Sequence, residues 1–195
     1  MKERGVAEAL VRERLPRRVV RQLRGPPVLL SESFIDETLK GTTADLVMQL
    51  PMRRRHDAFV YCVVEHKRIT QPRALVQVLR YLTAVYAWLD RKHRVGPLPP
   101  VVPIVIFNGA QPWRGAKRFR ELLDDSSAAA SLSVDFGVTM IDLRNESLYA
   151  LSRHPTLRGG LLALKAAAVD TAHVEPVLDE MLGSLVDKLG SLVVG

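Results

Sequence analysis

The stretch Ala58-Phe59-Val60-Tyr61-Cys62-Val63-Val64-Glu65-His66-Lys67 decides the fold. It is rich in aromatic and β-branched residues, which is typical of a β-strand. Side chains alternate between the two faces of a strand, so Glu65 and Lys67 share one face at its end. Such an apolar strand ending in a carboxylate and an ammonium group has two interpretations. Either the strand has reached solvent there, or it presents a chemically active pair.

The residues before this strand predict a β-hairpin. Residues 44–50 form a candidate strand, and the polar sequence Pro-Met-Arg-Arg-Arg-His-Asp over 51–57 suits the connection. With a turn centred near residue 55, the numbers of opposed residues sum to about 110, which places Asp45 across from Glu65. Two opposed carboxylates need a counter-ion, which Lys67 or a divalent cation could supply. Two carboxylates, a backbone carbonyl and waters are typical of a magnesium site.

A helix is predicted to begin near Pro72, because apolar residues recur with a 3.6-residue period from Leu75 to Leu89. Gln77 and Tyr81 are four residues apart and therefore share one face of this helix. Arg80 lies beside them. The pair is either a polar row that faces the two carboxylates or the edge of a helix with a half-buried tyrosine.

The remaining elements complete an α/β pattern. Helices are predicted over 5–24 with a break at Pro16, a short helix or turn over 31–40, and a short helix over 116–124. Strands are predicted over 101–108, buried on both faces, and over 137–143. From Glu146 to about Leu189 the chain reads as helical, with interruptions at Pro155, Gly159-Gly160 and Pro176. The order of these elements predicts an α/β domain with a mixed sheet over 1–145 and a helical C-terminal extension over 146–195.

Charge favours a polyanionic partner on one side of the molecule. The formal net charge is +7, and residues 1–24 hold eight Lys/Arg and three Glu. Arg53, Arg54 and Arg55 at the predicted hairpin tip either contact phosphates or form a solvated loop. The single cysteine excludes an internal disulfide and a cysteine-based zinc site. No apolar run approaches the ~20 residues that span a bilayer, and no signal peptide is recognisable, so a cytoplasmic protein is expected.

The hairpin and helix motifs together resemble the PD-(D/E)XK nuclease superfamily. Asp45 matches the acid that opens one strand, Glu65-His66-Lys67 matches the acid-any-lysine triplet, and Gln77 with Tyr81 matches the Gln-x-x-x-Tyr helix of the RecB-like branch. Further strings resemble the recombination-promoting nuclease family, also described as YhgA-like transposases. These strings are Ser33-Phe34-Ile35-Asp36-Glu37, Leu98-Pro99-Pro100-Val101-Val102-Pro103, Phe107-Asn108-Gly109 and Pro112-Trp113. Two departures are Lys67, where relatives often carry Gln, and Ala44, where the superfamily usually has proline.

The resemblance implies a restriction-endonuclease-like mixed sheet flanked by helices and a magnesium-dependent DNA endonuclease. Asp45, Glu65 and the backbone carbonyl of His66 would hold Mg²⁺ or another divalent cation, which activates water for phosphodiester hydrolysis. Lys67 would orient that water. The residues that would position or bind DNA are Gln77, Tyr81, Arg53, Arg54, Arg55 and Arg80. Glu37 either supports a second metal or is a surface acid.

Three functions remain open from the sequence. The first is a DNA endonuclease in recombination or transposition-like events, and the second is an inactive or truncated DNA-binding remnant of a transposase-like protein. The third is a protein-interaction module that uses its helical tail. An apolar stripe from Val177 to Leu189 either packs on the chain's own core or forms a homodimer.

Overall fold

The computed structural model describes residues 2–30, 46–53, 58–65, 73–92, 96–109, 111–124, 126 and 128–167. Its α-helices are α1 (Lys2–Arg14), α2 (Arg17–Val20), α4 (Ala74–Lys92) and α5 (Pro155–Ala167). Its strands are β1 (Val28–Leu29), β2 (Leu46–Leu50), β3 (Ala58–Glu65), β4 (Val101–Phe107) and β5 (Thr139–Asp142). Short 3-10 turns are η1 (Phe119–Leu122), η2 (Ala128–Leu132) and η3 (Leu148–Ala150).

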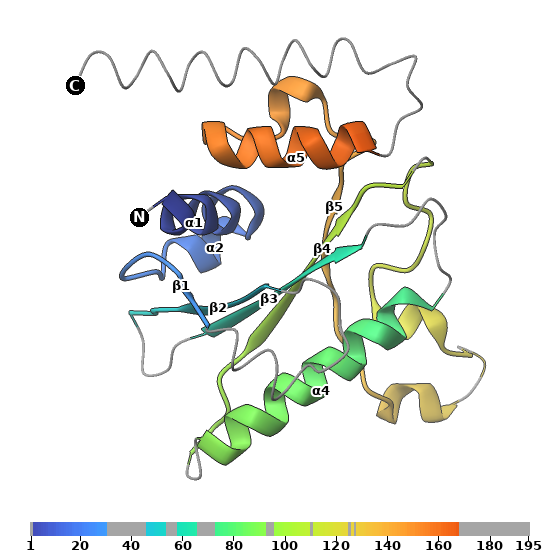
Figure 1. Ribbon diagram of the computed structural model, residues 1–195. Helices are drawn as coiled ribbons and strands as arrows, with labels where there is room; N and C mark the ends of the chain where they lie inside the picture. Colours follow the sequence, from blue (N-terminus) through green and yellow to red (C-terminus); the bar gives the residue numbers. More distant parts are fainter. Residues whose placement is uncertain are drawn as a thin grey trace, which may run out of the picture.

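The five strands form one mixed sheet in the order β1-β2-β3-β4-β5. The β1–β2 and β2–β3 pairs are antiparallel, whereas β3–β4 and β4–β5 are parallel. The predicted mixed α/β sheet is therefore confirmed (Figure 1). The sequence did not predict β1, because two residues are too short for a period-2 pattern to emerge.

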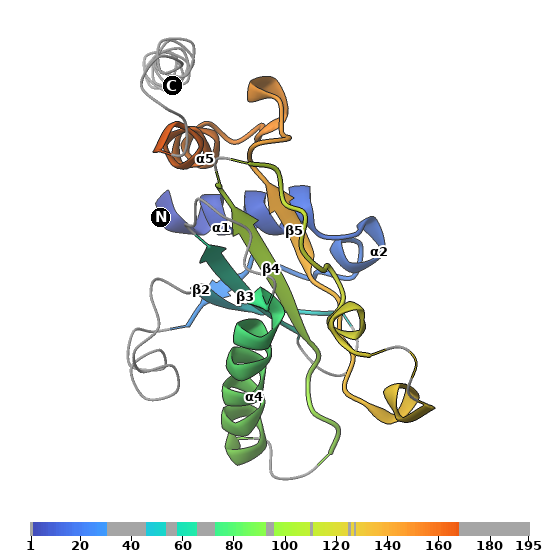
Figure 2. The same ribbon diagram turned by 90° about the vertical axis from the view of Figure 1, so that its right-hand side faces the viewer.

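Helices cover both faces of the sheet. Figures 1 and 2 show α4 on one face and α1 with α5 on the other. Strand β4 contributes side chains to the core on both faces of the sheet. Ile104 and Ile106 belong to the core cluster of α1 and α5, while Val105 packs with α4. The prediction that this strand is buried on both faces is confirmed.

The register of the β2–β3 hairpin corrects the expected pairing. Leu46 pairs with Cys62 and Leu50 with Ala58, so opposed residue numbers sum to 108 rather than about 110. The connection spans 51–57 and is centred on residue 54, one residue earlier than assumed. The predicted opposition of Asp45 and Glu65 therefore does not follow from this register. Asp45 itself lies outside the described residues.

Helix α4 follows the predicted period, with Leu75, Val78, Leu82, Val85 and Leu89 buried. This apolar stripe docks the helix on the sheet. The polar Gln77 lies on the same helix at the edge of that stripe and is half-buried.

Two helix predictions were wrong in detail. Helix α5 begins at Pro155, as suits a first-turn proline, but it continues through Gly159-Gly160. The helix cost of two glycines, about 1 kcal/mol each, is offset because Leu157, Leu161 and Leu162 are buried in the core cluster that also contains α1. The helix predicted over 116–124 is instead the single 3-10 turn η1.

Several expectations fall on parts of the chain that the structure does not describe. These are the short helix or turn over 31–40, the apolar stripe from Val177 to Leu189 and the interruption at Pro176. Within the described ranges, none of the helices combines the length and apolarity required to cross a bilayer.

Candidate active site at the carboxyl ends of the parallel strands

Three neighbouring strands end at the same edge of the sheet. Glu65, the last residue of β3, pairs with Phe107 of β4, and Phe107 pairs with Asp142 of β5. These three strands are parallel, so the row marks their carboxyl ends. Ligands of α/β proteins bind preferentially outside the carboxyl ends of parallel strands. The register thus places Glu65 at an edge suited to a functional site.

Helix α4 begins beside this edge and brings Gln77 and Tyr81 together. The Gln77 Nε2 donates a hydrogen bond to the Tyr81 Oη at 2.8 Å. The Tyr81 ring is buried, with 8% of its surface exposed, and belongs to the core cluster beneath α4. The prediction that both residues share a helix face is confirmed. Arg80, between them in sequence, is exposed.

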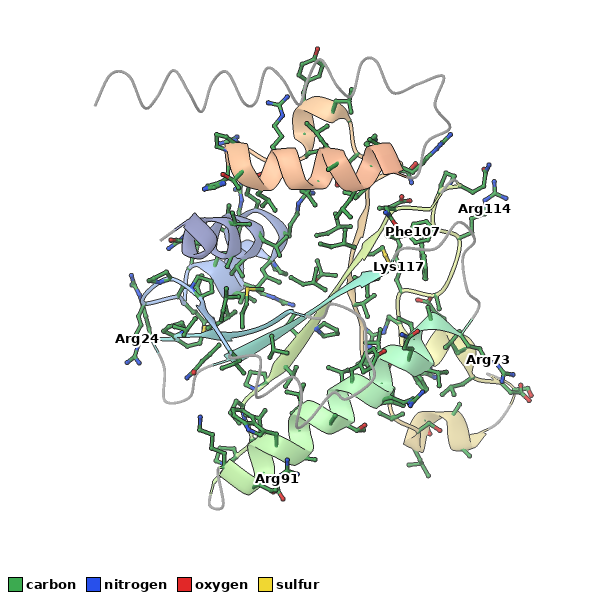
Figure 3. All side chains as sticks on the ribbon, viewed as in Figure 1. Arg24, Arg73, Arg91, Phe107, Arg114 and Lys117 are labelled. Atoms are coloured by element: carbon green, nitrogen blue, oxygen red, sulfur yellow. The ribbon has the colours of Figure 1, made fainter. Side chains whose placement is uncertain are left out.

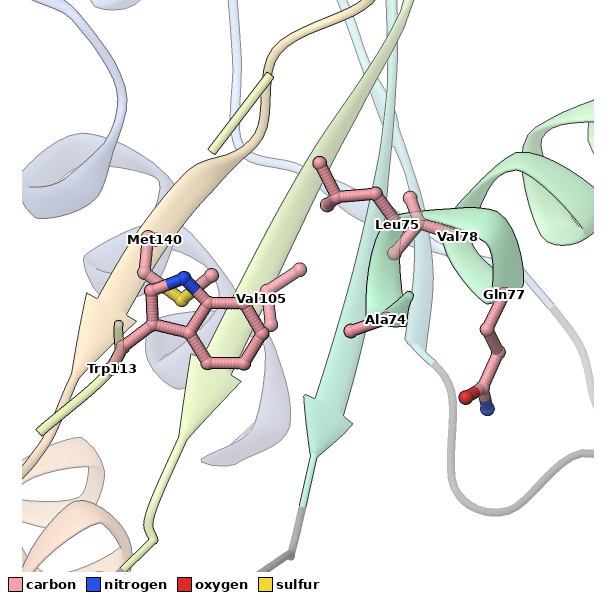
Figure 4. A pocket seen from close by; sticks show the side chains of 7 residues that line it. All are labelled: Ala74, Leu75, Gln77, Val78, Val105, Trp113 and Met140. Atoms are coloured by element: carbon pink, nitrogen blue, oxygen red, sulfur yellow. The ribbon is translucent and has the colours of Figure 1, made fainter. Parts of the chain in front are cut away.

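A small hollow lies between the start of α4 and strands β4 and β5. Its lining residues are Ala74, Leu75, Gln77, Val78, Val105, Trp113 and Met140. Figure 4 shows Trp113 and Met140 on the β5 side and the α4 residues opposite them. Gln77 supplies the amide in this otherwise largely apolar lining. These residues form a largely apolar, packed lining beside the strand ends, which we call the wall of the site, and the hollow is not a polar pocket.

Hydrogen bonds to the Asp142 carboxylate stabilise this wall. Its Oδ2 accepts hydrogen bonds from the Trp113 backbone N–H at 2.9 Å and the Asn145 side-chain amide at 2.7 Å. Its Oδ1 accepts from the Arg144 backbone N–H at 3.1 Å. The Trp113 ring meets Phe107 edge-on, with centroids 5.0 Å apart. Sequence reasoning missed Asp142, although an acid one residue before the end of the predicted strand over 137–143 was a usable signal.

Helix α5 fastens the loop that follows Asp142. The Lys165 ammonium donates to the backbone carbonyls of Leu143 at 2.6 Å and Glu146 at 2.5 Å, with Arg144 farther at 3.4 Å. Burial lowers the pKa of Lys165, and the nearby Arg144 charge lowers it further, while Asp142 and Glu146 oppose the change. Lys165 thus joins α5 to the carboxyl end of β5.

The structure brings together only part of the predicted site. Glu65 ends β3, and Gln77 and Tyr81 form a hydrogen-bonded pair on α4. Arg53 lies at the hairpin tip, beyond the opposite end of β3, so it is not near Gln77 and Tyr81. The predicted residues outside the described part of the chain are Glu37, Asp45, Arg54, Arg55, His66 and Lys67.

The metal ligands stay a prediction. Among the residues that the structure describes, no group of three or more His, Cys, Asp or Glu side chains is arranged to hold a metal ion. Asp142, at the same sheet edge as Glu65, already accepts three hydrogen bonds with its two oxygens. The donor set predicted for Mg²⁺, namely Asp45, Glu65 and the His66 carbonyl, is chemically suited to that ion.

Comparison with known proteins identifies relatives across much of the chain. The model of the family described as "Putative transposase, YhgA-like" matches residues 1–189. Recombination-promoting nuclease RpnD of Escherichia coli O157:H7 is 30% identical over 88 residues, which cover 44% of this chain and 34% of the relative. RpnC of Escherichia coli strain K12 is 32% identical over 82 residues, 42% of this chain and 26% of the relative.

A third relative carries a different description. The inactive recombination-promoting nuclease-like protein RpnE of Escherichia coli strain K12 is 26% identical over 103 residues, 51% of this chain and 33% of the relative. The matched regions thus span about a third or less of each relative. No solved structure matches the chain.

Proposed function

The chain belongs to the YhgA-like transposase family, and we propose that it is a magnesium-dependent DNA endonuclease acting in recombination or transposition-like events. Two relatives are named recombination-promoting nucleases, which supports nuclease activity. The cytoplasm is the compartment we expect for such an activity.

The observation that carries the proposal is the meeting of two motifs at one sheet edge. Glu65 lies at the carboxyl end of β3, in register with Phe107. Phe107 packs with Ala74, the first residue of α4, and Gln77 and Tyr81 follow on that helix. Two motifs that are separate in sequence and individually weak therefore converge on one place. A hydrogen-bonded Gln–Tyr pair beside a strand-end acid is the arrangement that the proposal requires.

Asp45 and Glu65 are the proposed carboxylate ligands. Val47 is buried in the cluster beneath α4, and in an extended chain Asp45 shares the face of Val47. The proposal puts Asp45 and Glu65 on the α4 face of the sheet, the face on which Phe107, the register partner of Glu65, packs with Ala74. The His66 carbonyl completes the protein ligands, and Glu37 either supports a second ion or is a surface acid.

The remaining residues act on the substrate and on water. A bound Mg²⁺ would polarise the scissile phosphate and lower the pKa of a bound water. Lys67 orients the attacking water and offsets the charge that develops on the phosphate. Gln77, fixed by Tyr81, directs its amide toward the DNA backbone, and the exposed Arg80 contacts a phosphate.

A plasmid-nicking assay with purified protein tests this proposal. Wild type is expected to convert supercoiled plasmid to nicked and linear forms with Mg²⁺ and not with EDTA. Asp45→Ala and Glu65→Ala are expected to abolish cleavage while circular dichroism stays unchanged. Asp124→Ala is the matched control, because within the described part of the chain this exposed carboxylate accepts hydrogen bonds from Ser126 beside it and from no other residue. Equal cleavage by wild type and both site variants would reject the assignment.

A second candidate is a DNA-binding protein that does not cleave. The relative named inactive supports it, because the family contains at least one member described in that way. The same assay separates the two: binding in a mobility-shift experiment, without Mg²⁺-dependent nicking by wild type, would favour this candidate.

A further inference from the structure

The arginine-rich segment after α1 is joined to the tip of the β2–β3 hairpin. Leu23 and Met52 form an antiparallel bridge. Two backbone hydrogen bonds flank it, from Arg24 N to the Pro51 carbonyl at 2.9 Å and from Arg53 N to the Gln22 carbonyl at 2.8 Å. Two basic stretches that lie about thirty residues apart in sequence therefore form one surface.

Five arginines make up this surface, and all are exposed: Arg17, Arg18, Arg21, Arg24 and Arg53. We call them the arginine surface. The sequence has no Asp or Glu between Glu13 and Glu32, nor between Asp45 and Asp57. Within the described ranges, no acidic side chain forms an ion pair with Arg17, Arg21 or Arg53. Positive charge is thus concentrated here, and among the described residues Arg17, Arg21 and Arg53 have no ion-paired carboxylate.

The apolar side chains of the same segment point the other way. Leu23 is buried in the core cluster of α1 and α5, and Val19 and Val20 pack against that cluster. Hence the segment presents guanidinium groups outward and keeps its apolar side toward the protein. A membrane-surface helix requires an exposed apolar face, which these three residues do not provide.

The arginine surface lies at the end of the sheet opposite the candidate active site. Strand β3 begins at Ala58, next to the hairpin tip, and ends at Glu65. At ~3.3 Å per residue the eight-residue strand separates the two ends by roughly 23 Å. Figure 3 shows this separation, with Arg24 on one side of the molecule and Arg73 and Arg114 on the other.

We propose that the arginine surface binds the phosphate backbone of duplex DNA, without regard to sequence and away from the site of cleavage. The inference rests on the proposed function in taking DNA as the partner. Guanidinium groups bind phosphates through paired N–H donors. Five exposed arginines on one surface offer several contacts to the phosphates of a duplex, and each contact releases counterions. The surface anchors the substrate, while the residues at the carboxyl ends of the strands act on it.

The test compares two variants that each lose three positive charges. Arg17→Gln/Arg21→Gln/Arg53→Gln removes charge from the arginine surface. Arg91→Gln/Lys92→Gln/Arg153→Gln removes the same charge from exposed basic side chains elsewhere. Fluorescence anisotropy with a 20-base-pair duplex of arbitrary sequence, in EDTA, is measured across a salt titration. Circular dichroism and thermal unfolding confirm that both variants are folded.

The surface variant is expected to raise the Kd at least tenfold near 0.1 M salt, and the control variant by less than about twofold. Each lost phosphate contact lowers the slope of log K against log salt by ~0.9, so the slope should fall by about two to three. Equal weakening in both variants would overturn the proposal, as would an unchanged slope. Preferential binding of wild type to vesicles containing phosphatidylserine rather than to the duplex would overturn it as well.

Failure of this inference is distinguishable from failure of the proposed nuclease. Binding in EDTA does not depend on cleavage, so a wild type that does not nick plasmid can still lose affinity in the surface variant. Conversely, wild type could cleave with Mg²⁺ while the surface variant binds DNA as tightly as wild type does. That result would refute the role of the arginine surface in DNA binding and leave the proposed nuclease activity standing.

Discussion

The Asp142 carboxylate accepts a hydrogen bond from the Trp113 backbone N–H at 2.9 Å, which ties the end of β5 to the loop after β4. The same carboxylate accepts from Arg144 N and from the Asn145 amide. Through Trp113 it also supports Phe107, the residue that pairs with Glu65. Asp142 therefore stabilises the wall of the candidate site without needing to touch the substrate.

Replacing Asp142 by Asn removes the charge and one acceptor oxygen while keeping the shape. Hydrogen bonds to charged groups contribute about 1.5–3 kcal/mol each, so Asp142→Asn should lower the free energy of unfolding by roughly 1–3 kcal/mol. Urea denaturation followed by tryptophan fluorescence measures it. Asp124→Asn should change stability by less than about 0.5 kcal/mol. An equal loss of unfolding free energy in Asp142→Asn and Asp124→Asn would show that Asp142 stabilises only its own turn and not the wall of the site.

Tyr81→Phe isolates the role of the tyrosine hydroxyl. The ring stays in its buried place, but the Gln77 amide loses its acceptor. We expect single-turnover cleavage to fall about tenfold or more, because a misplaced positioning group is costly even at small displacements.

Tyr86→Phe is the matched control for this experiment. Its hydroxyl also accepts one hydrogen bond, from Val101 N at 3.2 Å, but it lies further along α4, beside the start of β4. Cleavage by Tyr86→Phe should equal wild type. If both variants lose activity alike, the effect comes from helix packing and not from the Gln77–Tyr81 pair.

Lys67 separates the role of a charge from that of a hydrogen-bond donor. Lys67→Gln keeps a hydrogen-bond donor and loses the charge, so measurable cleavage should remain. Lys67→Ala should lose more, up to the ~10²–10³ in rate typical of one oriented donor. Single-turnover cleavage across a Mg²⁺ titration measures both, with Lys117→Gln as an exposed-lysine control. If the Gln and Ala variants are equally inactive, the charge is essential; if both match wild type, Lys67 is only a solvated strand end.

Lys165→Met tests the link between α5 and the end of β5. The carbonyls of Leu143, Arg144 and Glu146 would lose their ammonium donor. We expect a loss of about 1–3 kcal/mol in stability, read from urea denaturation. The control is Lys92→Met, whose ammonium lies 4.7 Å from the Trp88 ring centroid and is exposed, an arrangement that contributes ~0.5–1 kcal/mol. A smaller effect at Lys165 than at Lys92 would contradict the proposed link.

The sequence by itself determined the elements whose signals are local. The aromatic and β-branched composition of β3, the apolar run of β4 and the helical period of α4 each follow from residues adjacent in the chain. The sharing of one helix face by Gln77 and Tyr81 is likewise a consequence of their spacing. Features of this kind can be predicted from local composition and from the side-chain periods of 2 residues in a strand and 3.6 residues in a helix.

Only the tertiary structure decided what depends on distant partners. The numbers of paired residues in the β2–β3 hairpin sum to 108, because the turn is centred one residue earlier than assumed. No local sequence pattern specifies the position of that centre. Burial of Leu161 and Leu162 in the cluster with α1 keeps α5 helical through two glycines that its own propensity opposes. Asp142 became part of the site because β5 pairs with β4, and the arginine surface formed because Leu23 meets Met52. Each of these outcomes is set by packing between residues far apart in the chain, and helix or strand propensity carries no information about such contacts.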